Sequence, residues 1–351
     1  MSAVGDAREG EVSGHHTSLR SARLDAMRGL AVTGIVLSHA VKLHVGDSSP
    51  AFAFVSAFAM PLFALVSGYL TSPPDDDGAH WLGWRARRLL VPFGVWAVLH
   101  WSVAQFASTG LDLLGIEGSL PGYLIAVVLH PWQGLWFLLV AFYWSAIAVL
   151  ISRYAHSVRA IAGIAAAAVA LSGAVVWARQ AGTFESPADF GLVSLLGLLP
   201  YFAGGYALGR MGLSVSEGLP VRAGVAGLAA LAAVAVSVVV TTRMGATPLR
   251  ASLDVVESVL GAVGFALLAA SAPERMLAPL ASLGGASLGV YAMHFAFLRV
   301  GAGSGWTLVA TSFVVALAAS FALTKLVRLS PVSAEILLGE ARVRRRGRPR
   351  R

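Results

Sequence analysis

The feature that most constrains this chain is a succession of apolar runs, each about 20 residues long. A helix of that length crosses the roughly 30 Å of hydrocarbon in a bilayer. Only 13% of the residues are charged, against about 25% in soluble domains. The sequence therefore predicts an all-α, polytopic integral membrane protein with about ten transmembrane helices. The expected spans are 24–43, 51–70, 89–108, 133–151, 159–178, 190–209, 222–241, 252–271, 279–298 and 305–326.

The distribution of Lys and Arg between the loops predicts the orientation of these spans. One set of loops and ends carries 20 of the 26 basic residues, the opposite set carries 5, and Arg28 lies inside the first span. Basic residues accumulate on the cytoplasmic side of membrane proteins, so we expect both termini in the cytoplasm. The predicted organisation is a disordered cytoplasmic lead over 1–20, a transmembrane domain over 21–329 and a basic cytoplasmic tail over 330–351.

Composition also excludes several kinds of chemistry. The chain has no cysteine, which removes disulfides, thiolate metal sites and cysteine nucleophiles, and we expect no metal. The basic run RVRRRGRPRR at the end favours contact with anionic lipid head groups rather than with nucleic acid. The bias toward Arg, Ala and Val suggests a bacterial protein, so we expect a multi-pass protein of the bacterial plasma membrane.

Polar residues inside the first span are the strongest indication of a site. Arg28 and His39 are 11 positions apart, which places them on one face of a helix and about 16 Å apart along its axis. Asp25 lies one turn before Arg28 and is placed to pair with it. Charged residues at this depth are costly and usually functional. Two simpler explanations stay open: Arg28 extends toward the interface, or His39 hydrogen-bonds within the bundle.

Four further stretches carry motifs that form an ordered set with the first span. They read MPLFALVSGYL (60–70), WRARRLLVPFGVW (84–96), LWFLLVAFYW (135–144) and SLGVYAMHFAFL (287–298). Together with the Arg-x10-His spacing of LDAMRGLAVTGIVLSHA, the set resembles the acyltransferase family 3 membrane proteins over about residues 20–330. The MPLF form is similar to the fucose-acetylase-like branch of that family.

The resemblance implies an activity, its substrates and a set of site residues. Members of the family move an acyl group, usually acetyl, from cytoplasmic acyl-CoA to a hydroxyl of a sugar or related acceptor. We therefore expect a membrane O-acyltransferase that works in the lipid bilayer, with acyl-CoA as donor and a hydroxyl-bearing glycan, glycolipid or metabolite as acceptor. The expected residues are His39 and Arg28 for catalysis, Arg85, Arg88, Ser67 and Tyr69 for donor binding, and Tyr291 and His294 for acceptor binding.

The donor-binding assignment agrees with elementary chemistry. Acyl-CoA carries several phosphate charges, and guanidinium groups bind phosphate in a bidentate manner. Arg85 and Arg88 also satisfy the positive-inside rule without any ligand. Gly68 would let a backbone approach the donor closely, yet Ser67 and Gly68 are equally typical of contacts between membrane helices.

The catalytic assignment rests on the properties of imidazole. An acceptor hydroxyl must lose its proton as it attacks the thioester, and imidazole titrates in the range suited to a general base, so His39 is expected to take that role. We favour direct transfer because the chain has no cysteine, while an acyl-serine or acyl-histidine intermediate stays open. His294 either orients the acceptor or packs within the bundle.

Two other classes of protein compete with an enzyme. A secondary transporter or flippase would also need about ten helices and buried polar groups. Buried carboxylates and broken helices near mid-depth would favour that class, but the ionisable residues within the expected spans are mainly Arg and His. A receptor or scaffold with a degenerate site is the third possibility.

Overall fold

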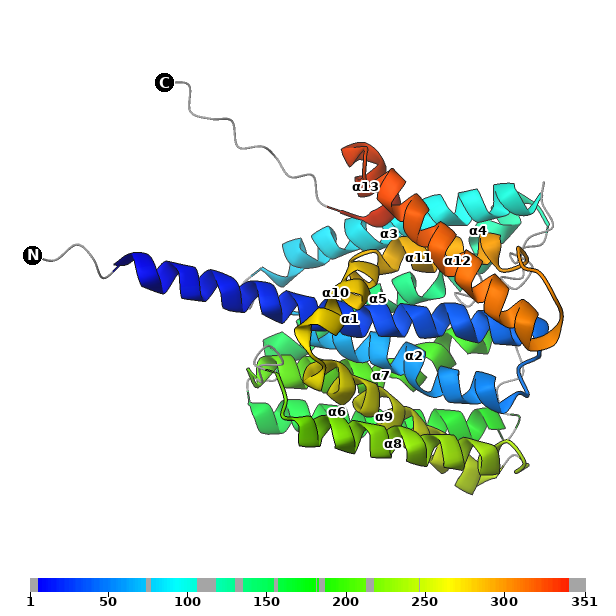
Figure 1. Ribbon diagram of the computed structural model, residues 1–351, viewed down its shortest axis with the longest axis horizontal. Helices are drawn as coiled ribbons and strands as arrows, with labels where there is room; N and C mark the ends of the chain where they lie inside the picture. Colours follow the sequence, from blue (N-terminus) through cyan, green and yellow to red (C-terminus); the bar gives the residue numbers. More distant parts are fainter. Residues whose placement is uncertain are drawn as a thin grey trace, which may run out of the picture.

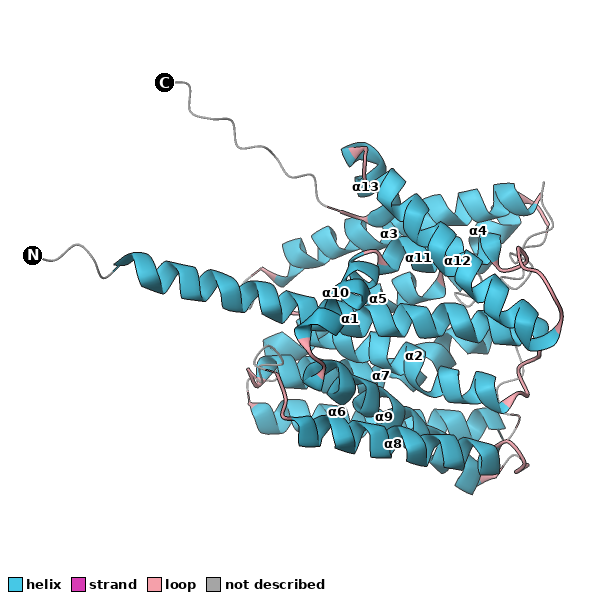
Figure 2. Cartoon of the chain, viewed as in Figure 1, coloured by secondary structure: helices cyan, strands magenta, loops and turns pink. Residues whose placement is uncertain are grey.

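The computed structural model describes residues 6–340 except 74–76, 106–117, 130–134, 155–156, 181, 183–186, 213–217 and 246. The described residues form helices and loops and contain no strand (Figure 2). The elements are α1 (Asp6–His44), α2 (Pro50–Tyr69), α3 (Gly78–Ala104), α4 (Leu120–Leu129), α5 (Trp136–Tyr154), α6 (Val158–Gln180), α7 (Pro187–Arg210), α8 (Val221–Thr241), α9 (Pro248–Ser271), α10 (Glu274–Gly285), α11 (Ser287–Met293), the 3₁₀ turn η2 (His294–Phe297), α12 (Gly305–Val327) and α13 (Pro331–Leu338).

Six helices in the described part of the chain are long and apolar enough to cross a membrane. They confirm six of the ten predicted spans. The predicted first and last residues of these six spans lie within a few residues of the observed ones. The six are Ala22–His44, Pro50–Tyr69, Trp136–Arg153, Val221–Thr241, Leu249–Ser271 and Gly305–Val327.

The other predicted spans have different outcomes. The span expected over 279–298 is broken: α10 and the segment Ser287–Phe297 meet at an angle of 57°, and they count as a seventh span only when taken together. The spans expected over 89–108, 159–178 and 190–209 lie largely within α3, α6 and α7, which are helices but do not meet the same criteria over the described residues. The total of ten is therefore not confirmed.

Both ends of the predicted membrane domain carry helices that the sequence did not predict. Helix α1 begins at Asp6 and so covers most of the lead over 1–20 that was expected to be disordered. No proline interrupts this stretch, and extending an existing helix is far easier than nucleating one. At the other end, α13 lies inside the expected tail over 330–351 and packs against α3. The basic run over 342–351, expected to contact lipid head groups, lies outside the described residues.

Helix α1 occupies the centre of the bundle. Helices α2 and α6–α9 lie on one side of it, and α3, α11 and α12 lie on the other (Figure 1). The backbones approach closely at glycines, as is common between membrane helices. A Cβ on Gly284 of α10 would lie 1.6 Å from the carbonyl oxygen of Asp25, and one on Gly205 of α7 would lie 1.9 Å from that of Leu65. These contacts hold α10 against α1 and α7 against α2.

Gly68 serves the same purpose, which favours the helix contact among the two roles that the sequence left open for it. A Cβ at Gly68 would lie 2.0 Å from the carbonyl oxygen of Phe202, so Gly68→Ala must push α2 away from α7. We expect this variant to lose about 1–3 kcal/mol of unfolding free energy through overpacking.

Gly94→Ala in α3 is the matched control for that prediction. A Cβ at Gly94 would have no atom within 4 Å, so alanine should be neutral or stabilise by up to about 1 kcal/mol through helix propensity. Thermal unfolding of both variants in the same detergent measures the difference. Equal unfolding temperatures would mean that the α2–α7 contact does not need glycine.

Candidate active site

A cavity of about 460 Å³ lies beside α1, between the C-terminal part of α2, the first turns of α3, α5 and the break between α10 and α11. Its wall carries four arginines and one glutamate, together with aromatic and small side chains. The charged and polar residues in the wall are Arg28, Arg85, Arg88, Arg328, Glu340, Ser67, Ser72 and Ser287. Three of the residues that the sequence assigned to donor binding, and one assigned to catalysis, are thus brought together.

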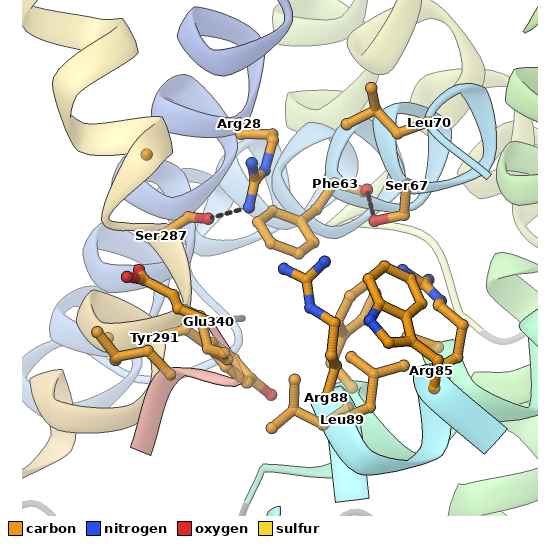
Figure 3. Close-up of a pocket in the computed structure, with 18 of the residues that line it drawn as sticks. Arg28, Phe63, Ser67, Leu70, Arg85, Arg88, Leu89, Ser287, Tyr291 and Glu340 are labelled. Carbon is orange, nitrogen blue, oxygen red and sulfur yellow. Dashed lines mark hydrogen bonds between the residues drawn. The ribbon is translucent and has the colours of Figure 1, made fainter. Parts of the chain in front are cut away.

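Arg28 lies at one side of this cavity and is held there by two hydrogen bonds. It donates to the carboxylate of Asp25 at 3.1 Å, as the spacing predicted, and to the Ser287 hydroxyl at 2.9 Å (Figure 3). Ser287 begins α11 immediately after the break in the span, and it is fully buried. The break therefore presents a hydroxyl to Arg28 that a continuous helix would have placed differently.

Arg85 and Arg88 reach the cavity from the same face of α3, one turn apart. Arg85 donates to the Ser145 hydroxyl at 3.1 Å and stacks on Trp81, while Arg88 lies over the ring of Trp84 with 4.7 Å from Cζ to the centroid. Such stacking orients a guanidinium group without neutralising it. Arg87, between them, is exposed and does not line the cavity.

The segment that follows α12 closes part of the cavity, which the sequence did not predict. Arg88 donates from Nε to the carbonyl oxygen of Gly339 at 2.8 Å, and Leu338 and Glu340 line the wall. Glu340 forms an ion pair with Arg328, at 2.6 Å between Nη2 and Oε1. Residues 330–340 contain two glutamates and no Lys or Arg, and the sequence had grouped them with the basic tail that follows.

Ser67 and Tyr69, the two residues with polar side chains in the Ser-Gly-Tyr motif of α2, have different surroundings in the structure. Ser67 lines the cavity, and its hydroxyl donates to the carbonyl oxygen of Phe63 at 2.7 Å. Tyr69 is buried and does not belong to the cavity wall, while its backbone lies against Gly205 and Gly209 of α7. The structure therefore places Ser67, but not Tyr69, where a donor could reach it.

His39 and His294 form a hydrogen-bonded pair deeper in the bundle. His39 Nδ1 and His294 Nε2 are 2.8 Å apart, and the ring planes differ by 11°. His294 Nδ1 lies 2.8 Å from the carbonyl oxygen of Tyr291. His294 is fully buried and His39 is half-buried against Phe295. The sequence predicted both histidines as site residues but did not predict that they touch.

A chain of aromatic rings leads from the cavity wall to this pair. Phe63, Phe137 and Tyr291 line the cavity, and their rings form a chain with centroid distances of 4.9 and 6.4 Å. The ring of Tyr291 also lies 6.2 Å from that of His294. His39 itself is not part of the cavity wall in this conformation.

A second, apolar cavity of about 260 Å³ lies between α3, η2 and α12. His100 lines it and is fixed by a 2.8 Å hydrogen bond between Nε2 and the carbonyl oxygen of Ala292. This cavity lacks the arginines of the first, so the candidate site remains the cationic cavity and the histidine pair next to it.

The fold and the site together define a multi-pass helical membrane protein with an internal cationic cavity beside a buried histidine pair. The chain belongs to the acyltransferase domain family Acyl_transf_3, which matches residues 21–327. The family resemblance inferred from the motifs is thereby confirmed.

A curated relative matches over a shorter stretch. Nodulation protein NolL of Mesorhizobium japonicum is 30% identical over 95 residues, which are 25% of this chain and 26% of that protein. The chain therefore aligns with about a quarter of the length of that relative. No solved structure matches the chain.

Proposed function

We propose that this protein is a membrane O-acyltransferase that moves an acyl group, preferably acetyl, from acyl-CoA to a hydroxyl of a carbohydrate or related acceptor. The observation that carries the proposal is the gathering of Arg28, Arg85 and Arg88 in one cavity, with His39 further along the same helix as Arg28. Membership of the acyltransferase family supports the reaction type. The cationic cavity supports a donor that carries phosphate groups.

The donor occupies the cationic cavity from the cytoplasmic side. Its phosphates bind the guanidinium groups of Arg85 and Arg88, which the tryptophans beneath them hold in place. This orientation puts both termini in the cytoplasm, in agreement with the distribution of basic residues. Arg28 and Ser67, on the opposite wall, contact the pantetheine arm as it extends toward the histidine pair.

The chemical step is a direct transfer with His39 as general base. The acceptor oxygen attacks the thioester carbonyl carbon while its proton passes to the imidazole of His39. The carbon–sulfur bond then breaks, and the thiolate that leaves takes the proton from His39, which yields the ester and free CoA thiol. The base returns to its starting state without a covalent intermediate.

This route requires side chains of the cavity wall to move. About 16 Å of helix separates Arg28 from His39, and His39 does not line the cavity. Tyr291 lines the cavity and its ring lies 6.2 Å from that of His294, so donor binding must shift the wall near Tyr291 before the thioester reaches His39.

A transfer assay on the purified protein tests the proposal. The protein is reconstituted in nanodiscs with labelled acetyl-CoA and an extract of envelope glycans and lipids, and labelled ester is measured together with free CoA thiol. Production of both in equal amounts supports the enzyme. Uptake of a labelled solute into proteoliposomes without ester formation would contradict it.

The broken span is the observation that favours a second function, a secondary transporter or flippase. Transporters commonly bind substrate where a helix is interrupted near mid-depth, and here α10 and α11 meet at 57° beside Arg28. Glu257, buried in α9, does not line this cavity, and its carboxylate accepts hydrogen bonds from Ser237 and Thr241. Among the described residues of the cavity wall the one carboxylate is Glu340, which is paired with Arg328. A carboxylate placed for ion coupling is therefore not among them, and we rank this function second.

Glu340→Gln should strengthen donor binding if phosphates use the cavity. The carboxylate pairs with Arg328 in the cavity wall and competes with any anion that enters. A partly exposed ion pair of this kind is worth up to about 1 kcal/mol, so the Kd for CoA should fall by up to roughly fivefold.

Isothermal titration of CoA measures this change, with Glu335→Gln as the control. Glu335 belongs to α13 but does not line the cavity, so that variant removes the same charge from outside the site. A Kd that falls equally in both variants would indicate a general effect of charge and not a cavity that binds phosphate.

A further inference from the structure

The hydrogen bonds of His294 determine which of its nitrogens carries the proton. Nδ1 lies 2.8 Å from the carbonyl oxygen of Tyr291 and 3.2 Å from that of Val290. A carbonyl oxygen only accepts, so Nδ1 must be the N–H donor. In the neutral ring, the other nitrogen, Nε2, is then a bare acceptor.

The state of His294 in turn fixes the tautomer of His39. His294 Nε2, as an acceptor, faces His39 Nδ1 at 2.8 Å, so the hydrogen between them belongs to His39 Nδ1. His39 Nε2 is consequently the nitrogen with the free lone pair. An unassisted imidazole would populate both tautomers, and only one of them offers a base at Nε2.

The end of helix α11 explains why His294 is so well oriented. The helix ends at Met293, and the carbonyls of a helix's last turn lack a donor within the helix. His294 begins the 3₁₀ turn η2 and directs its Nδ1–H back to the carbonyl of Tyr291 in that last turn. Its ring is completely buried and parallel to that of His39 to within 11°.

We propose that His294 is a positioning residue for the base and not an acceptor-binding residue. A chain of hydrogen bonds runs from the Tyr291 carbonyl through His294 to His39. It holds His39 in the tautomer that has a hydrogen on Nδ1 and a lone pair on Nε2. When His39 takes the proton of the acceptor hydroxyl on Nε2, its Nδ1–H bond to His294 Nε2 stabilises the resulting charge. This inference rests on the proposed function only for its effect on rate. The tautomer itself is a property of the resting protein.

Two substitutions at His294 separate positioning from packing. In His294→Gln, the amide oxygen reaches the place of Nε2 and can still accept from His39 Nδ1. In His294→Asn, the shorter amide reaches only the place of Nδ1, so it keeps the hydrogen bond to the Tyr291 carbonyl but loses His39. We expect His294→Asn to lower kcat about tenfold, at the lower end of the 10–100-fold losses that follow removal of the partner that orients a metal-bound histidine. His294→Gln should stay within about threefold of the wild type, and KM for acyl-CoA should be unchanged in both.

Nitrogen-15 NMR of histidine-labelled protein in nanodiscs reads the tautomer directly, with the His39 signal assigned as the one lost in His39→Gln. The inference predicts a protonated Nδ1 and a bare Nε2 for His39 in the wild type and in His294→Gln, and a mixture in His294→Asn. A wild-type His39 protonated on Nε2, or an unchanged tautomer and kcat in His294→Asn, would overturn it. Full turnover in His39→Ala would instead refute the proposed base, and the NMR result would still decide the tautomer.

Discussion

His39→Ala is expected to lower kcat for acyl transfer by about 10²–10⁴-fold, the usual contribution of a positioned general base. The pKa of the acceptor hydroxyl lies far above neutral pH, so the hydroxyl does not ionise by itself. Its attack on the thioester therefore slows when no imidazole takes the proton. The Kd for CoA should change little, because His39 is not part of the cavity wall that holds the arginines. Single-turnover transfer and titration of CoA measure the two quantities separately.

His44→Ala is the matched control for this substitution. His44 lies on the same helix, five residues later, and its Nε2 bonds to the Ser312 hydroxyl at 2.9 Å, away from His294. It therefore tests whether loss of any polar contact made by α1 lowers activity. Equal losses in the two variants, or turnover in His39→Ala that matches the wild type, would remove His39 from the role of base.

Much of this site could be predicted because it depends on helix periodicity. Arg28 and His39 lie on one α-helix, so their spacing fixes their shared face. Arg85 and Arg88 are one turn apart and reach the cavity together. Ser67 arrives there because α2 runs antiparallel to α1 and the short connection between them leaves little freedom. In each case a local rule determined the outcome.

The missed features depend on contacts between segments far apart in the sequence. Arg328 and Glu340 line the cavity only because α13 folds back onto α3, where the Trp96 indole donates to the carbonyl oxygen of Leu337 at 2.8 Å. No periodic pattern encodes such a return of the chain. The short helix after the last span was therefore predicted to be part of the basic tail over 330–351.

The sequence did not predict the break between α10 and α11, because the hydropathy of this segment does not change at the break. Residues 279–298 are mostly apolar and read as one span, but small residues surround the break and allow the chain to turn by 57°. The consequence for the site is large, since Ser287 reaches Arg28 and His294 reaches His39 from the same reoriented segment. The sequence identified His294 as a candidate, yet only the packing of α11 against α1 gives it a partner.

Replacing both cavity arginines of α3 is expected to have the second-largest effect. Arg85→Ala with Arg88→Ala should raise the Kd for CoA on the order of 10²–10⁴-fold, because each charge-assisted hydrogen bond to phosphate is worth about 1.5–3 kcal/mol. At saturating donor, kcat should fall far less, since neither residue contacts the histidine pair. Titration at several salt concentrations should also show a weaker salt dependence in the double variant, because fewer charges take part in binding.

Arg87→Ala distinguishes donor binding from membrane orientation as the reason for these arginines. Arg87 lies between the other two on the same helix, carries the same charge and satisfies the positive-inside rule equally, but it is exposed and outside the cavity. If the positions were basic only to orient the helix, Arg87→Ala would resemble either single variant, and CoA affinity would not change in any of them. If the cavity binds phosphate, Arg87→Ala keeps the wild-type Kd while Arg85→Ala and Arg88→Ala each raise it. A double variant with undiminished affinity for CoA, correctly inserted as judged by protease accessibility of its ends, would mean that the donor does not occupy this cavity.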